Sequence, residues 1–217
     1  MSWRRRTPYR CRAQARLLFL LPPRAAECSR DMKVGVVSDT HLPRFGDRLP
    51  PGLRRGLGEQ GVELILHLGD FTGPRVPSLF EALAPLEAVA GNNDPPALVR
   101  RFGRRKVVTL AGVRVGLVHG DGTRGTTTSR SLSAFEDDEV DVICFGHSHR
   151  PVCERRGEIW LVNPGSPTDK RTQARYSYAV LDIRGAHVEQ RLVFFDRDGI
   201  EPRDRTPPAR GARAAQP

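Results

Sequence analysis

Five short apolar runs between residues 33 and 146 dominate the pattern of hydrophobic and polar positions along the chain. Each run is rich in Val, Ile and Leu and is bounded by Gly or polar residues, as expected of a strand that is buried on both faces of a sheet. The sequence therefore predicts five central strands. They are KVGVVS from residue 33, ELILHLG from 63, LEAVAG from 86, VRVGLVHG from 113 and VDVICFG from 140.

Segments with helical potential separate several of these runs, and strands that alternate with helices favour βαβ units. These segments lie around Leu53–Gln60, Val76–Ala84 and Thr127–Asp137. After Pro151 the pattern changes to the stretches VCERRGEIWLVN, YSYAVLDIRG and HVEQRLVFF. Turns at Arg156-Gly157 and Arg184-Gly185 indicate that these stretches form antiparallel strands.

The length of 217 residues fits one large domain or one domain with tails. The formal net charge of +10 is concentrated at the two ends, because residues 1–31 hold eight Arg and two acidic residues and residues 197–217 hold five Arg and three acidic residues. Residues 32–196 therefore carry a net charge of only +2. A near-neutral domain argues against nucleic acid as a partner. No apolar stretch is long enough to span a bilayer, so we expect no membrane partner.

The two ends of the chain differ from the middle in composition. We expect residues 1–31 to be a disordered basic extension or a non-native start, with Met32 as the natural start directly before the first strand. The apolar patch Leu17–Leu21 is too short for a secretory signal. Residues 197–217 are polar and Pro-rich and are expected to be a disordered tail, which leaves a domain at residues 32–196. The four cysteines, two of them in the first 31 residues, form no disulfide framework and favour a cytoplasmic protein.

Side chains that can bind metal ions follow each of the five apolar runs. They are Asp39 and His41 in SDTH, Asp70 in GD, Asn92, Asn93 and Asp94 in GNND, His119 in HG, and His147 and His149 in GHSH. In open α/β sheets, ligands bind at the carboxyl edge of the strands. Residues two apart on an extended segment point to the same side, so Asp-x-His and His-x-His can each offer both groups to one site. The pattern therefore predicts a metal site at this edge.

A single polar residue at a strand end is usually part of a turn, but five such endings are hard to attribute to turns alone. A structural zinc site is the alternative, and its ligands would be Cys144, His147, His149 and Cys153. Against it, Cys144 has the opposite strand parity to His147, and the spacings are not those of a zinc knuckle. We expect His67 to be packed beside Asp70, and His187 to lie on the surface of a hairpin.

The motifs SDTH, HLGD, GNND, VHG, GHSH and NPGS resemble, in this order, those of the calcineurin-like metallophosphoesterases, particularly the small YfcE-like phosphodiesterases. The resemblance covers about residues 32–195. It implies an α/β fold, a four-layer αββα sandwich of two facing mixed β-sheets flanked by helices, with a dinuclear metal centre. Position by position, Asp39, His41 and His149 would hold one metal ion and Asn92, His119 and His147 the other, with Asp70 as the bridge. The catalytic positions would be Asp70, Asn93 and His119.

The chemistry of such a centre is well defined. Two divalent cations roughly 3.5–4 Å apart lower the pKa of a bridging water and clamp the phosphoryl oxygens of the substrate. Carboxylate, amide and imidazole ligands without thiolate suit Mn²⁺, which we expect first, or Ni²⁺, Fe²⁺, Zn²⁺ or Mg²⁺. We therefore expect a hydrolase of phosphoric esters that acts on a small phosphate ester, in particular a phosphodiester. Self-association of the chain is left open.

One position departs from the pattern of many relatives, which carry His directly after the ligand Asn. Here that residue is Asn93, which cannot act as a general acid in the usual pH range. We expect Asp94 to orient His119 or another ligand from behind. The loop NPGSP at residues 163–167 would line the site in the resemblance, but by itself it indicates only a tight turn.

Two other functions compete with the phosphoesterase. The first is a protein-interaction scaffold, since a retromer subunit of the same fold works in this way. Against it, every ligand position of this chain holds a competent residue. The second is a nuclease, which the total charge favours, but residues 32–196 are near neutral and lack a basic, aromatic-rich groove signal.

Overall fold

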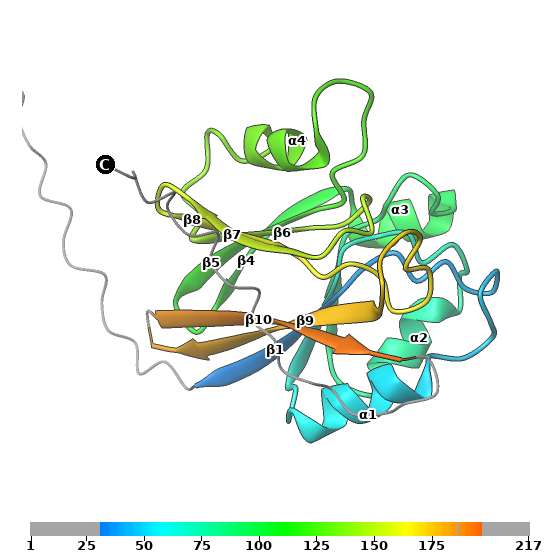
Figure 1. Ribbon diagram of the computed structural model, residues 1–217. Helices are drawn as coiled ribbons and strands as arrows, with labels where there is room; N and C mark the ends of the chain where they lie inside the picture. Colours follow the sequence, from blue (N-terminus) through cyan, green and yellow to red (C-terminus); the bar gives the residue numbers. More distant parts are fainter. Residues whose placement is uncertain (1–30, 186, 197–217) are drawn as a thin grey trace, which may run out of the picture.

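The structure is a computed structural model that describes residues 31–185 and 187–196. The expectations for residues 1–30 and 197–217 lie outside the described residues. Within the described part, the chain forms two five-stranded sheets that face each other (Figure 1). The strand order is β10-β9-β1-β2-β3 in sheet A and β4-β5-β6-β8-β7 in sheet B.

Sheet A is mixed, because β1, β2 and β3 are parallel while β9 and β10 run antiparallel to their neighbours. Its strands are β1 (Met32–Val37), β2 (Leu64–His67), β3 (Leu86–Ala88), β9 (Tyr176–Arg184) and β10 (His187–Phe195). Sheet B is mixed in the same way, with β5, β6 and β8 parallel and β4 and β7 antiparallel at its two edges. Its strands are β4 (Arg105–Leu110), β5 (Val113–Val118), β6 (Val142–Phe145), β7 (Val152–Arg156) and β8 (Ile159–Asn163).

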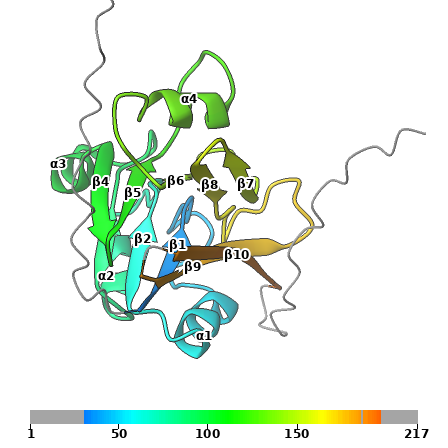
Figure 2. The same ribbon diagram turned by 90° about the vertical axis from the view of Figure 1, so that its left-hand side faces the viewer.

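Helices cover the outer faces of both sheets. Helices α1 (Pro51–Glu59) and α2 (Val76–Glu81) lie outside sheet A, and α4 (Thr127–Ser133) lies outside sheet B (Figures 1 and 2). Helix α3 (Pro96–Phe102) connects the two sheets at one side (Figure 2). This arrangement confirms the predicted four-layer αββα sandwich. No helix of the described residues is both long and apolar enough to cross a membrane.

Most strands of the two sheets contribute to an apolar core on each face, which explains why the runs are mostly apolar. On β2, Leu66 packs between the sheets while its neighbour Ile65 packs against α1 and α2. On β6, Cys144 faces the inter-sheet core, while Ile143 belongs to the outer core with Phe135, which follows α4, and Leu132 of α4. A sheet buried on both faces leaves few polar positions within its strands, so the chemistry is found at the strand ends.

All five predicted central strands are present, as β1, β2, β3, β5 and β6, and the two predicted hairpins are β7–β8 and β9–β10. The three predicted helices are also present, although α4 ends at Ser133, before the predicted end. Helix α3 and strand β4 were not predicted. Helix α3 has only seven residues, and β4 is a half-exposed edge strand that follows a run of arginines, so neither has a strong periodic signal.

Candidate metal centre

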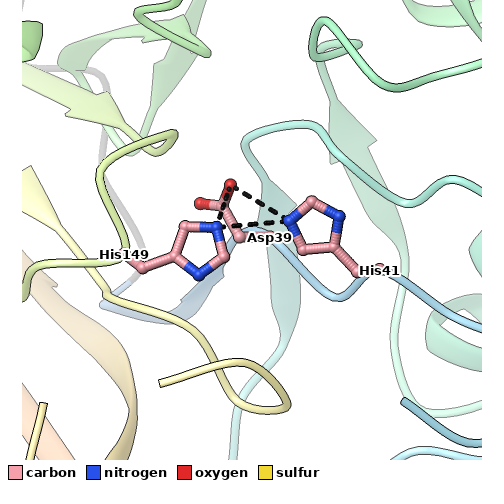
Figure 3. Close-up of side chains that lie close together, drawn as sticks. All are labelled: Asp39, His41 and His149. Atoms are coloured by element: carbon pink, nitrogen blue, oxygen red, sulfur yellow. Dashed lines mark hydrogen bonds and ion pairs between the residues drawn. The ribbon is translucent and has the colours of Figure 1, made fainter. Parts of the chain in front are cut away.

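Asp39, His41 and His149 meet between the ends of the two sheets, although 108 residues separate the two histidines in sequence. Nε2 of His149 lies 3.3 Å from Oδ1 of Asp39, and Nε2 of His41 lies 3.8 Å from the same oxygen. The two Nε2 atoms are 3.2 Å apart, and both rings direct a nitrogen toward the Asp39 carboxylate (Figure 3). All three side chains are buried. This is the first of two sets whose ligand atoms are close enough to hold one cation.

Asp70 lies between this set and His119. Its Oδ2 is 3.7 Å from Nε2 of His41 and 3.3 Å from Nε2 of His119. His119 also approaches Asp39, with Nε2 3.9 Å from Oδ1. Asp39, Asp70 and His119 therefore form the second set, and their ligand atoms lie within 4.8 Å of one another.

Asn92 and His147 lie beside the second set and are more exposed. Oδ1 of Asn92 and Nδ1 of His147 are 3.1 Å apart, and the His147 ring stands at 77° to that of His119 with 5.2 Å between the centroids. His147 thus contacts both Asn92 and His119, but it belongs to neither of the two sets that surround the carboxylates. Their role as ligands remains a prediction from the resemblance.

Five of the seven predicted ligands have left-handed backbone, in loops beyond the last residue of each strand. Their φ angles are 55° for Asp39, 46° for His41, 59° for Asp70, 63° for His147 and 55° for His149. The extended backbone expected for each Asp-x-His and His-x-His pair was therefore wrong, although Asp39 and His41 do offer both groups to one set, as expected. Residues other than Gly rarely adopt this conformation, and it persists only where the surrounding structure holds it.

Backbone hydrogen bonds between the loops hold the turn that carries Asp39 and His41. The N–H of Asp39 donates to the carbonyl of Gly69 at 3.0 Å, and the N–H of His41 donates to the carbonyl of Asp70 at 2.9 Å. The amide of His147 donates to Oδ2 of Asp39 at 2.9 Å, which links the end of sheet A to the end of sheet B.

The segment after β8 also supports this turn. The hydroxyl of Ser166 donates to the Asp39 carbonyl at 2.7 Å, and the hydroxyl of Thr168 donates to the Thr40 carbonyl at 2.6 Å. Asn163 donates to the Gly146 carbonyl at 2.8 Å, directly before His147. The NPGSP loop therefore borders the site as well as forming a turn, and the sequence had no signal for these long-range contacts.

Two glycines allow the loops after β2 and β3 to touch. A Cβ added to Gly69 would lie 2.7 Å from Cα of Gly91, and a Cβ added to Gly91 would lie 2.6 Å from N of Asp70. Real Cβ atoms do not approach backbone this closely, so Asp70 and the Asn92 loop lie side by side only because both positions lack a side chain.

The tautomers of two histidines are set by backbone carbonyls. Nδ1 of His119 donates to the Leu68 carbonyl at 2.6 Å, and Nδ1 of His149 donates to the Asp169 carbonyl at 2.6 Å. Because Nδ1 carries the proton in each neutral ring, the lone pair of Nε2 points toward the carboxylates. This is the usual arrangement of a histidine that binds a metal ion through Nε2.

The buried charges fit a cation. Burial opposes ionisation of Asp39 and Asp70, but bonds and attraction to His149 and His119 outweigh it, and the pKa of both carboxyls is lowered. Burial likewise opposes protonation of His119, yet the same carboxylates raise its pKa to about 9. In the absence of another cation, the positive charge of protonated His119 offsets the negative charges of the two buried carboxylates.

Two buried atoms of the site make no hydrogen bond of normal geometry among the described residues, although each has an ion-pair contact at 3.3 Å. They are Oδ1 of Asp39 and Nε2 of His119, the atoms that face each other across the site. A buried polar atom without a partner is costly and rare in folded proteins. A divalent cation between carboxylate and imidazole would satisfy both atoms, so the residues present fit a metal ion.

Asn93 and Asp94 contact the loop of Asp70. The backbone and side-chain amides of Asn93 both donate to the Asp70 carboxylate. Asp94 accepts the N–H groups of Asp70, Thr72 and Gly91 at 2.8 to 2.9 Å. Asp94 therefore orients Asp70 and not His119.

The alternative zinc site is not formed. Neither cysteine belongs to a set that could hold a cation within the part of the chain that the structure describes. Cys144 is buried in the inter-sheet core, and Cys153 packs against the same core. His67 is fully buried and stacks on Phe71, which confirms that it is a packed residue. His187 is exposed at the start of β10, as expected.

Comparisons with known proteins agree with this geometry. Residues 32–186 match the family model of the calcineurin-like phosphoesterase superfamily domain. A probable metallophosphoesterase of Methanothermobacter thermautotrophicus is 36% identical over 167 residues, which cover 75% of this chain and 92% of that protein. A phosphodiesterase of Methanocaldococcus jannaschii is 29% identical over 144 residues, 62% of this chain and 83% of that protein.

The solved structures show the same fold. The crystal structure of Vps29 from Chaetomium thermophilum superposes with a TM-score of 0.66 at 23% identity, covering 75% of this chain and 87% of that one. The matched family model covers every predicted ligand and every strand except β10, and its description agrees with the resemblance inferred from the motifs. The chain belongs to the calcineurin-like phosphoesterase superfamily.

Proposed function

We propose that the protein is a metal-dependent phosphoesterase that hydrolyses phosphodiesters. The observation that carries this proposal is the pair of buried atoms without a well-formed hydrogen bond, Oδ1 of Asp39 and Nε2 of His119, within a cluster of carboxylates and imidazoles. Their charged neighbours lie at 3.3 Å but do not complete hydrogen bonds, and a cation among these atoms would satisfy them.

The residues present can hold two divalent ions, with Mn²⁺ as the first expectation and Ni²⁺, Fe²⁺, Zn²⁺ and Mg²⁺ as alternatives. The ligand set proposed for one ion is Asp39, His41 and His149, and that for the other is Asn92, His119 and His147, with Asp70 shared between them. When bound, such ions supply hydroxide at neutral pH and neutralise charge on the phosphoryl oxygens.

The chain itself contributes orientation and charge. Oδ2 of Asp70 faces both His41 and His119, so this carboxylate can serve both ligand sets. Asn92 and Asn93 are exposed, so amide groups are accessible to a substrate phosphate at this side of the site. Neither amide can donate a proton as a general acid, so the leaving oxygen must depart with little help from this position.

The surface favours an enzyme over an interaction scaffold. Among the described residues, Leu83 is the one large hydrophobic side chain that is exposed, at 39%. Protein-binding surfaces usually carry a contiguous apolar patch. We therefore rank the non-catalytic scaffold second.

The basic run at residues 100–106 gives little support to a nuclease. Arg101 contacts Glu81, Arg105 contacts Asp138, and Lys106 bonds to Glu87 at 2.8 Å. Because these cations are paired on the protein, they do not form a free stripe for a phosphate backbone.

We propose a small phosphodiester as substrate. A cytoplasmic location stays a prediction from the sequence, and self-association stays open.

The deciding experiment is hydrolysis of phosphomonoesters, phosphodiesters, cyclic nucleotides and single-stranded DNA by the chelated protein and by protein resupplied with Mn²⁺. We expect no turnover after chelation, recovery with Mn²⁺, and the highest rates on diesters. Asp70→Asn should remove activity while the protein stays folded. The matched control is Asp137→Asn, an exposed aspartate outside both ligand sets. Full activity of Asp70→Asn, or of the chelated wild type, would refute the dinuclear proposal.

A further inference from the structure

His67 is a fully buried histidine that belongs to neither proposed ligand set. It ends β2 and points into the core between sheet A and helices α1 and α2. Its ring stacks on Phe71 with 3.6 Å between centroids and lies edge-on to Phe80 at 5.1 Å. Packing alone would accept a phenylalanine here, so the imidazole needs another explanation.

Both ring nitrogens of His67 have partners. The backbone N–H of Gly69 donates to Nδ1 at 3.3 Å, and Nε2 lies 2.6 Å from Oγ1 of Thr40. A backbone N–H can only donate, so Nδ1 accepts and Nε2 carries the proton that is donated to Thr40. Burial lowers the pKa of His67 to about 3, which agrees with a ring that stays neutral.

Thr40 is the central residue of the strained turn. It stands between Asp39 and His41, which both have left-handed backbone. Its side chain is held by His67, and its carbonyl accepts the hydroxyl of Thr168 at 2.6 Å. The turn is therefore fixed from the helix side of sheet A and from the loop after β8. Such conformations are retained only under several simultaneous contacts.

We propose that His67 is a positioning residue, which holds the Asp39–His41 turn in its metal-binding conformation through the hydrogen bond to Thr40. The inference rests on the proposed metal centre, but it assigns a role to a residue that touches no metal ion. Groups behind a ligand set that orient the ligands typically change metal affinity about 10–100-fold when removed. Since His67 acts on Asp39 and His41 indirectly, we expect about tenfold.

The test uses the full chain, stripped of metal, titrated with Mn²⁺ by calorimetry. His67→Phe keeps the stacking on Phe71 and removes both hydrogen bonds, while Thr40→Val keeps the shape of Thr40 and removes its hydroxyl. Each substitution should weaken Mn²⁺ binding about tenfold. The double variant should bind Mn²⁺ as tightly as either single variant, because both substitutions remove the same hydrogen bond. His67→Gln and Thr40→Ser can still form the bond and should recover most of the affinity.

The outcomes separate this inference from the proposed function. Mn²⁺ affinity of His67→Phe within twofold of wild type, or losses that multiply in the double variant, would overturn the positioning role. If His67→Phe does not fold, Thr40→Val decides alone, and unchanged affinity in that variant would overturn the role. If the wild type binds Mn²⁺ and no variant binds it more weakly, only this inference is overturned. A wild-type chain that binds no Mn²⁺ would overturn the proposed function and this inference together.

Discussion

The side-chain amide of Asn93 donates to Oδ2 of Asp70 at 2.6 Å, and the backbone amide of the same residue donates to Oδ1 at 2.8 Å. Asn93 therefore clamps the carboxylate that lies between His41 and His119. An amide in this place orients a ligand, but it supplies no proton to a leaving group.

The first prediction follows from this missing acid. Wild-type rates should depend steeply on the pKa of the leaving alcohol, because nothing at position 93 protonates the departing oxygen. Asn93→His should accelerate the cleavage of alkyl esters by part of the factor of about 10²–10⁴ that general acid catalysis supplies. Esters of acidic phenols should gain little. The measurement is rate against leaving-group pKa for both proteins at saturating metal.

Parallel slopes for the two proteins would argue against this account of Asn93. They would indicate a proton from water, or a role of Asn93 limited to the orientation of Asp70. The metal affinity of Asn93→His must be measured alongside, because the variant also removes the side-chain bond to Asp70.

The second prediction concerns Asp94, which accepts three backbone N–H groups around the Asp70 loop. In Asp94→Asn, one carboxylate oxygen becomes an NH₂ group that faces an N–H donor. We expect the free energy of unfolding to fall by about 2 kcal/mol, since hydrogen bonds to a charged group are lost in a buried place. Urea denaturation of the metal-free protein measures this. The control Asp137→Asn should leave the urea midpoint unchanged. An Asp94→Asn variant as stable as wild type would show that Asp94 does not stabilise the Asp70 loop.

A third prediction uses the contact between Gly69 and Gly91. Gly91→Ala places a methyl group 2.6 Å from the Asp70 nitrogen, so the loops after β2 and β3 must separate. We expect loss of Mn²⁺ binding and a destabilisation of about 2 kcal/mol or more. The control is Gly58→Ala in α1, where a Cβ meets nothing within 4 Å. That variant should be more stable by about 0.5–1 kcal/mol. Normal Mn²⁺ affinity in Gly91→Ala would contradict the predicted separation.

The fourth prediction concerns pH. The pKa of His67 is lowered to about 3 in the folded protein, against about 6.5 in an unfolded chain. As pH falls below about 6.5, the unfolded state takes up a proton that the folded state does not bind, so stability decreases by about 1.4 kcal/mol per pH unit. Metal-free His67→Phe lacks this contribution and should lose less stability than wild type between about pH 6 and pH 4. Thr40→Val retains His67 and should follow wild type. Identical pH profiles of wild type and His67→Phe would count against a buried neutral imidazole.

The fifth prediction concerns the extent of the domain. The family model matches residues 32–186, and every strand of the described residues lies between Met32 and Phe195. A chain limited to residues 32–196 should melt at the same temperature as the full chain and bind Mn²⁺ equally well. A melting temperature lower by several degrees would show that the omitted residues contribute to the fold. Salt-sensitive nucleic-acid binding that disappears with the shortening would assign that property to the basic ends.

Much of the architecture could be read from local patterns. The runs that form β1, β2, β3, β5 and β6 are mostly apolar because most of their residues are buried against one core or the other, and this signal can be read without knowing the contacts. The polar groups of Asp39, Asp70 and His119 stand at the strand ends because the strand interiors have no place for them. Their residue types point to metal chemistry before any contact is known.

Contacts between residues far apart in the chain decided the rest. The first three runs form one sheet and the last two another, which no local pattern distinguishes. The left-handed turn at Asp39 and His41 depends on Ser166 and Thr168, more than 120 residues away, and on His67 behind Thr40. Hydrogen bonds of this kind have no sequence period, since each needs one donor and one acceptor that only the packing of the two sheets brings together.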